Sequence, residues 1–161
     1  MHRRSRLAAL LALPVLAAVV LVGPGASAQG GRTLTFNELE KGSTFVHIRN
    51  TKTKSRRANS AGDVIAFTNP MADASGRVVG RSHVECVTTI GARNFLKSAL
   101  TCSGVAVLRD GTLSMQANTR PNDATTTGAI TGGTGAYANA RGVFTSQERR
   151  DGSVTTITLA E

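Results

Sequence analysis

Apolar and polar residues alternate along most of the chain after residue 43, with a period of two. Successive side chains in such a pattern point to opposite faces, which is typical of half-buried β-strands. The alternation predicts strands at residues 44–48, 63–68, 77–90, 95–108, 112–117, 125–130, 142–149 and 153–159. Asp110-Gly111 and Asp151-Gly152 are hairpin signals between them. Residues 33–36 can pair as a further strand, and helix signals are scarce.

The number of strands and their short connections indicate how the sheet closes. A flat sheet of eight strands would leave an open apolar face and two unpaired edges. Closure removes both edges and leaves an interior for side chains or one small ligand. We therefore expect an all-β fold, an eight-stranded antiparallel up-and-down β-barrel. One domain at residues 29–161 accommodates it, with no internal repeat.

The two cysteines provide a check on strand register. If Cys86 lies opposite Cys102 on adjacent antiparallel strands, their hairpin is centred near Asn94, within a segment of suitable turn residues. In an exported protein, which the pattern of residues 1–28 described below predicts, an even cysteine count favours a disulfide. A catalytic thiol is the alternative, but it requires a partner base and reducing conditions. We favour the structural disulfide.

Residues 1–28 have the pattern of a secretory signal peptide. Arg3, Arg4 and Arg6 precede the apolar run 7–22, and Ala26-Ser27-Ala28 supplies a small-x-small cleavage site. We expect cleavage after Ala28 and a secreted protein. A retained membrane anchor is the alternative. The apolar run is shorter than the roughly twenty residues that span a bilayer, so we expect no stable membrane span.

The chain is basic, with 19 Lys and Arg against 10 Asp and Glu and a net charge of +9. Without the three arginines of residues 1–28, 16 basic and 10 acidic side chains remain, a net charge of +6. Lys52, Lys54, Arg56 and Arg57 form one basic cluster. The charge favours contact with an anionic cell-surface polymer. Aromatic side chains on which bases could stack are few, with no Trp and one Tyr. We therefore expect no specific nucleic acid partner, and we expect residues 52–57 to form a solvated loop.

Residues with catalytic or metal-binding chemistry are sparse. After the predicted cleavage site the histidines are His47 and His83, and neither has a second ligand at a metal-binding spacing, so no metal site is expected. Alternation puts His83 and Glu85 on the face opposite Cys86. No nucleophile elbow, P-loop or strand-linked dinucleotide fingerprint is present. His47, His83 and Glu85 are candidate ligand-binding residues, with a surface or polar-core position as the alternative for each.

A glycine-rich segment, Thr131–Gly142, is the most distinctive part of the sequence. Its four glycines predict a tight corner between strands. The segment resembles the GGTG-x-[YF]-x-x-A-x-G signature of the allene oxide cyclase and dirigent superfamily. Residues 62–67, 76–80 and 108–113 resemble further elements of that family in the same order, and Cys86 and Cys102 sit on consecutive strands as in its bacterial members.

The resemblance implies a calycin-like barrel with an apolar cavity. Plant cyclases of this family close an allene oxide to a cyclopentenone, and dirigent members steer the coupling of phenoxy radicals. Neither group uses a metal or an organic cofactor, and each holds a reactive apolar intermediate in one conformation. The resemblance implies pocket roles for Tyr137 and Arg141, with a barrel-end plug and a surface cation as the alternatives. Glu38 and Glu40 lie near the family's glutamate-bearing first strand but do not match its pattern.

Two functions are compatible with these features. The first is a secreted dirigent-like or cyclase-like barrel that binds a small apolar molecule and steers its cyclisation or coupling. The second is a non-catalytic barrel, either a carrier or a cell-surface interaction module. Catalysis predicts ionisable residues that face a roomy cavity, whereas a carrier predicts an apolar lining. The glycine corner and the strand edges are also compatible with homo-oligomers.

Overall fold

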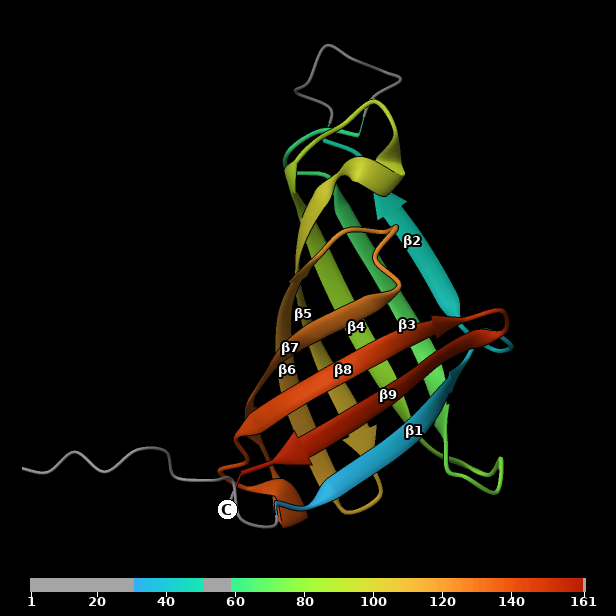
Figure 1. Ribbon diagram of the computed structural model, residues 1–161, viewed down its shortest axis with the longest axis vertical. Coiled ribbons are helices and arrows are strands. Elements are labelled where there is room, and N and C mark those ends of the chain that lie inside the picture. Colours follow the sequence, from blue (N-terminus) through green and yellow to red (C-terminus); the bar gives the residue numbers. More distant parts are fainter. Residues whose placement is uncertain (1–30, 51–58, 161) are drawn as a thin grey trace, which may run out of the picture.

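The computed structural model describes residues 31–50 and 59–160, which form one antiparallel sheet wrapped into a barrel (Figure 1). The predicted signal peptide and the basic cluster at 52–57 lie outside the described residues. The strands are β1 (Thr33–Leu39), β2 (Thr44–Ile48), β3 (Val64–Ala72), β4 (Val78–Ile90), β5 (Ala99–Leu108), β6 (Gly111–Thr119), β7 (Thr125–Gly133), β8 (Gly142–Arg149) and β9 (Gly152–Leu159). Two single-turn 3₁₀ helices, η1 (Phe95–Lys97) and η2 (Gly135–Tyr137), lie between strands.

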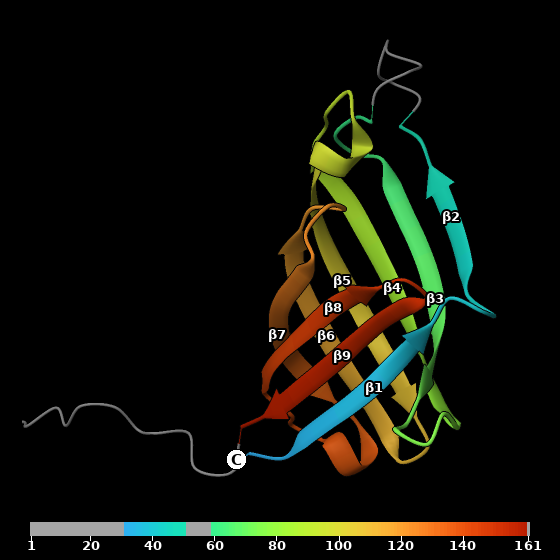
Figure 2. The ribbon, with the colours of Figure 1, turned by 45° about the vertical axis from the view of Figure 1, so that its right-hand side comes forward.

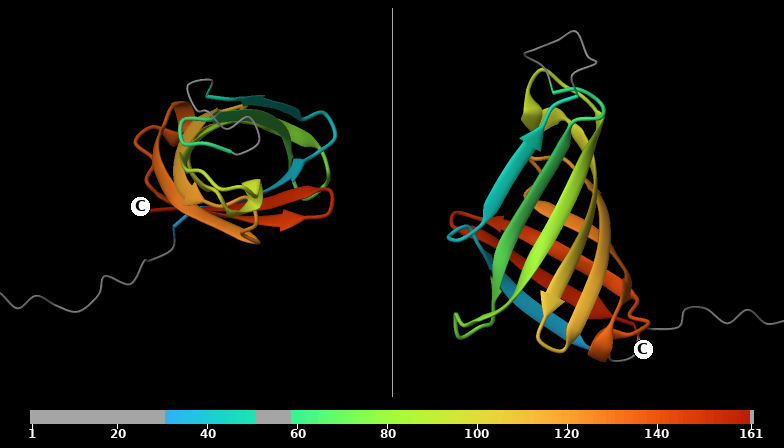
Figure 3. Two further views of the ribbon diagram at one scale, coloured as in Figure 1. Left: turned by 90° about the horizontal axis from the view of Figure 1, so that it is seen from above. Right: turned by 180° about the vertical axis from the view of Figure 1, so that it is seen from behind.

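Eight of these strands close the barrel, which confirms the predicted fold class (Figure 3). The eight strands that form the wall are not the same eight that the sequence pattern predicts. β1 pairs with β9 over its whole length and meets β3 at Asn37–Ala72 and Glu38–Met71, so it is the closing strand. β2, which the alternation pattern placed in the wall, is an additional strand. It pairs with residues 64–68 of β3, so β1 and β2 follow one another along the same edge of β3 (Figure 2).

Pro70 does not end the third strand, as the sequence pattern suggested; β3 continues through it to Ala72. The pairing explains why a proline fits there. β2 leaves the edge of β3 at Thr68, and β1 joins the same edge at Met71. Pro70 therefore lies where this edge has no partner, and a residue without an N–H is tolerated at such a position.

The predicted strand at 95–108 starts late. Residues 95–97 form η1 instead, because the side chain of Asn94 accepts a hydrogen bond from the N–H of Leu96 and the N–H of Ser98 bonds back to Phe95. Such local bonds from an asparagine favour a turn over a strand. Regular pairing with β4 begins at Ala99 and places Cys86 opposite Cys102.

Two apolar clusters fill different parts of the barrel. The larger cluster includes Met71, Leu113, Ile130 and Ile157 together with Tyr137 of η2, so it closes the end of the barrel that carries η2. The smaller one consists of Ile65, Cys86 and Leu100 with partly buried neighbours. At the closed end Gly135 has φ +60°, and a side chain at Gly133 would strike the backbone of Tyr137. The predicted glycine corner therefore has a steric cause.

Cys86 and Cys102 form a disulfide between β4 and β5, as their register predicts. The described residues include no helix with the length and apolarity required to cross a bilayer.

The disulfide should contribute measurably to stability. Replacing both Cys86 and Cys102 by serine should lower the free energy of unfolding by about 3 kcal/mol, the value of the chain-entropy model for a loop of about fifteen residues. Urea denaturation of the variant and of the oxidised and reduced wild type measures this difference. The reduced wild type should resemble the variant; equal midpoints for all three samples would contradict the expectation.

Candidate functional site

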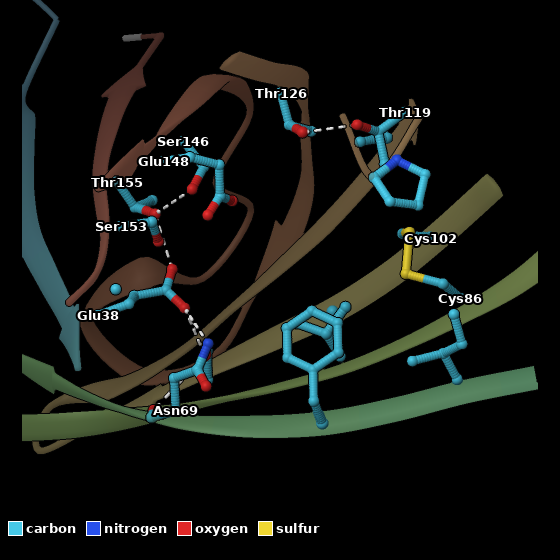
Figure 4. Close-up of a pocket in the computed structure, with 18 of the residues that line it drawn as sticks. Glu38, Asn69, Cys86, Cys102, Thr119, Thr126, Ser146, Glu148, Ser153 and Thr155 are labelled. Carbon is cyan, nitrogen blue, oxygen red and sulfur yellow. Dashed lines mark hydrogen bonds between the residues drawn. A yellow bond between two sulfur atoms is a disulfide. The ribbon is translucent and has the colours of Figure 1, made fainter. Parts of the chain in front are cut away.

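A cavity of about 600 Å³ lies inside the barrel wall. Its apolar side is built by inward-facing residues of the central strands and η1. These residues are Ile65, Phe67, Val84, Cys86, Phe95, Leu100, Cys102, Met115 and Phe144. The disulfide is thus part of the cavity wall (Figure 4). A space of this volume suits one small, mainly apolar molecule.

The polar side of the cavity is organised around the carboxylate of Glu38, whose residue is 9% exposed. One carboxylate oxygen accepts hydrogen bonds from Ser82 Oγ at 2.8 Å and Asn69 Nδ2 at 3.1 Å. The other accepts one from Thr155 Oγ1 at 2.7 Å (Figure 4). Buried polar groups are normally satisfied in this way.

A third hydroxyl, that of Ser146, extends this network. Ser146 Oγ lies 3.1 Å from Thr155 Oγ1. Because the single hydroxyl proton of Thr155 goes to the carboxylate, Ser146 must be the donor in this contact. The resulting chain of hydroxyl groups runs from Ser146 on β8 through Thr155 on β9 to Glu38 on β1. It holds the carboxylate in one orientation at the wall of the cavity.

Alternation within β1 explains why Glu38 faces inward. Leu34, Phe36 and Glu38 share one face of the strand, and the latter two are buried. The sequence contains this signal, because a carboxylate continues an apolar period-two pattern. The prediction missed it by ending the strand at residue 36. Because the predicted strand ended before Glu38, the pattern did not assign its side chain to either face of the sheet.

A second carboxylate, that of Glu148 on β8, also lines the cavity beside Glu38 (Figure 4). Partial burial, together with the negative charge of Glu38, raises the pKa of Glu148 above its ordinary value. The residue as a whole is exposed, however, so solvent screens part of this repulsion. The cavity therefore combines the carboxylate of Glu38, which three hydrogen bonds hold in place, with that of Glu148, which binds a proton more readily than an ordinary glutamate.

The mouth of the cavity is lined by three segments that connect strands. Glu40 and residues 43–45 line one part of it, and the β8–β9 hairpin with Arg149 and Arg150 lines another. Arg120 and Asp123 contribute from the β6–β7 connection. Phe45 lies at this rim with 64% of its surface exposed. The cavity is thus apolar and acidic within, and carries exposed charges of both signs at its mouth.

Most residues singled out from the sequence lie elsewhere. His83 and Glu85 are exposed on the outer face of β4, as their alternation with Cys86 predicts. Tyr137 is buried in the core of the closed end, where the guanidinium of Arg32 lies 5.3 Å from the centre of its ring. Arg141 is exposed and bonds to the carbonyl of Ala140. None of these four residues lines the cavity that contains Glu38.

His47 takes part in a separate polar cluster beside β2. Its Nε2 atom lies 3.5 Å from Oδ2 of the buried Asp63, and its ring is 6.2 Å from that of Phe95. Asp63 also accepts hydrogen bonds from the backbone N–H groups of Asn50 and Ser60. Burial alone would raise the pKa of Asp63, but these two bonds and the nearby His47 outweigh it and lower that pKa. The cluster joins the end of β2 to the start of β3.

Metal ligation has no assembled donor set in the part of the chain that the structure describes. Those residues include no group of three or more His, Cys, Asp or Glu side chains arranged to hold a metal ion.

Comparison with known proteins finds similarity of fold. No protein-family model and no curated protein matches the sequence. Among solved structures, a pyocyanin demethylase aligns over 80% of this chain and 100% of its own, with 23% identity and a TM-score of 0.65. The pterocarpan synthase dirigent protein PsPTS1 aligns over 84% and 99%, with 17% identity and a TM-score of 0.56. The Diels-Alderase AbmU from Streptomyces koyangensis aligns over 83% and 70%, with 13% identity and a TM-score of 0.58. The chain therefore shares the barrel fold of these proteins.

The raised pKa of Glu148 predicts a pH-dependent effect on stability. A carboxyl group whose pKa is raised by folding destabilises the folded state at neutral pH, and this penalty disappears below its ordinary pKa. Glu148→Gln should therefore raise the melting temperature at pH 7, with a gain that shrinks as the pH falls through the raised pKa. In a Glu38→Gln background the gain should be smaller. A pH-independent gain would show that charge is not its cause.

The lowered pKa of Asp63 predicts the opposite dependence. Its ionised form stabilises the folded state above its ordinary pKa, and this contribution is lost as the pH falls through the lowered value. Asp63→Asn should reduce the free energy of unfolding at pH 7 by about 1–3 kcal/mol, because one amide N–H loses its acceptor. Urea titrations of wild type and variant should converge in acid. A difference that persists unchanged at low pH would contradict this account.

Proposed function

We propose that this protein is a secreted dirigent-like or cyclase-like barrel that binds one small, mainly apolar molecule and steers its cyclisation or coupling. The observation that carries the proposal is the combination of an apolar cavity of about 600 Å³ with a buried, hydrogen-bonded carboxylate at one side. The apolar wall restricts the ligand's position, and Glu38 offers a fixed acceptor or negative charge. Such restriction lowers the entropic part of a reaction barrier.

The lining of the cavity favours this function over a pure carrier. A carrier for apolar molecules needs only an apolar wall, and burying a carboxylate without need is costly. Here Glu38 and Glu148 both line the cavity, and the protein supplies four hydroxyl and amide groups to organise Glu38. The pterocarpan synthase dirigent proteins and the Diels-Alderase among the structures with this fold lend support by analogy.

The ligand steering would act through placement and charge. Phe67, Phe95 and Phe144 limit the conformations of a bound molecule. Glu38 stabilises positive charge, or accepts a hydrogen bond, at the part of the ligand that reaches it. Glu148 can donate or receive a proton nearby, because its pKa is raised.

A pair of alanine variants tests cavity binding. Ala117 on β6 lines the cavity, whereas Ala129 on β7 is exposed on the outer face. We expect 1-aminoanthracene, a neutral apolar probe, to gain fluorescence with the wild type and with Ala129→Phe, and to lose at least about tenfold in affinity with Ala117→Phe, which fills the cavity. No binding by the wild type, or equal binding by both variants, would contradict the proposal.

Steering is measured separately from binding. Phenoxy radicals generated from a 4-hydroxycinnamyl alcohol by a one-electron oxidant couple without enantiomeric preference in free solution. With the protein present we expect an enantiomeric excess, which Ala117→Phe abolishes and Ala129→Phe retains. Probe binding combined with racemic products would favour the carrier function for this class of substrate.

A further inference from the structure

The interior of the cavity carries negative charge that the protein does not neutralise. Glu38 is nine-tenths buried, and the groups that bond to it, Asn69, Ser82 and Thr155, are all neutral. Within residues 31–50 and 59–160, the ion pairs join His47 to Asp63 and Arg77 to Asp73, and neither involves Glu38 or Glu148. An ionised carboxylate in a low-dielectric site without a counter-charge is costly.

The cations nearest to the cavity are directed elsewhere. Arg120, Arg149 and Arg150 line its mouth but are exposed to solvent. Arg81, on the strand next to Asn69, donates to the carbonyl of Gly42 and to Thr68 Oγ1. The three arginines at the mouth are therefore at the surface, where salt screens their charge over about 8 Å. Glu38, which is buried, is screened far less.

Part of the cavity wall is aromatic. Phe67 and Phe95 line the cavity from β3 and η1, and Phe144 lines it from β8. The faces of aromatic rings attract cations, most strongly where water is excluded. A cavity lined by both a carboxylate and phenylalanine rings is thus suited to a ligand that is both apolar and positively charged.

We infer that the cavity binds a compact apolar cation, such as a substituted ammonium or an N-alkylated heteroaromatic ring, with its positive centre beside Glu38. The inference rests on the proposed function, because it names the class of molecule that the same cavity takes. A cation supplies the missing counter-charge, and its alkyl or aromatic groups fill the apolar volume. An anionic ligand would instead be repelled by Glu38 and retained at the arginines of the mouth.

A displacement experiment tests the charge preference. Phenyltrimethylammonium and tert-butylbenzene have nearly the same shape and differ in charge, 4-tert-butylphenol is a neutral hydrogen-bond donor, and benzoate is an anion. Each is titrated against the complex of the purified protein with 1-aminoanthracene at physiological salt. We expect phenyltrimethylammonium to displace the probe at a concentration about tenfold or more below that of any of the other three.

Variants assign the preference to the carboxylates. Glu38→Gln should abolish it, Glu148→Gln should reduce it, and Glu85→Gln, on the outer face of β4, should leave it unchanged. Probe binding reports whether each variant folds. If the Glu38→Gln variant no longer binds the probe, the inference is tested by whether Glu148→Gln reduces the preference for the cation.

The outcomes separate this inference from the proposed function. Strong probe binding without a preference for the cation overturns the inference and leaves an apolar binding cavity. The same holds if tert-butylphenol or benzoate competes as well as the cation, or if Glu85→Gln removes the preference. Failure of the wild type to bind the probe removes the proposed function itself.

Discussion

Closure of the barrel depends on a short seam between β1 and β3. Only two residue pairs join these strands, and Glu38 belongs to one of them. Its side chain extends the seam by reaching Asn69 on β3, Ser82 on β4 and Thr155 on β9. The same carboxylate gives the cavity its acidic side. Glu38 thus contributes both to closure of the barrel and to the chemistry of the site, so a substitution at this residue affects both.

The parts of the fold that follow from local patterns could be predicted. Period-two alternation defines which side chains face inward on β4, and it separates Cys86 from His83 and Glu85 without further information. A hairpin centred near Asn94 then specifies the partner of Cys86. These inferences succeed because strand geometry and register are set by neighbours in sequence.

The closing strand and the acidic site depend on distant parts of the chain. The three residues that hold the carboxylate of Glu38 are 31, 44 and 117 positions away. No local pattern shows that residues 33–39 fill the last place in the wall while 44–48 stay outside it. Tyr137 and Arg141 illustrate a related difficulty. Their motif marks the glycine corner, but that corner folds against the closed end of the barrel, away from Glu38.

The shared edge of β3 has a consequence for the diversification of such barrels. β1 and β2 occupy successive lengths of that edge, and residues 40–43 connect them beside the cavity mouth. Because the eight-stranded wall closes without β2, we expect a longer or shorter connection to displace β2 and the ring of Phe45 and to leave the pairing of the wall in place. Access and selectivity can thus change through insertions and deletions in one peripheral segment, independently of the scaffold that keeps the chain folded.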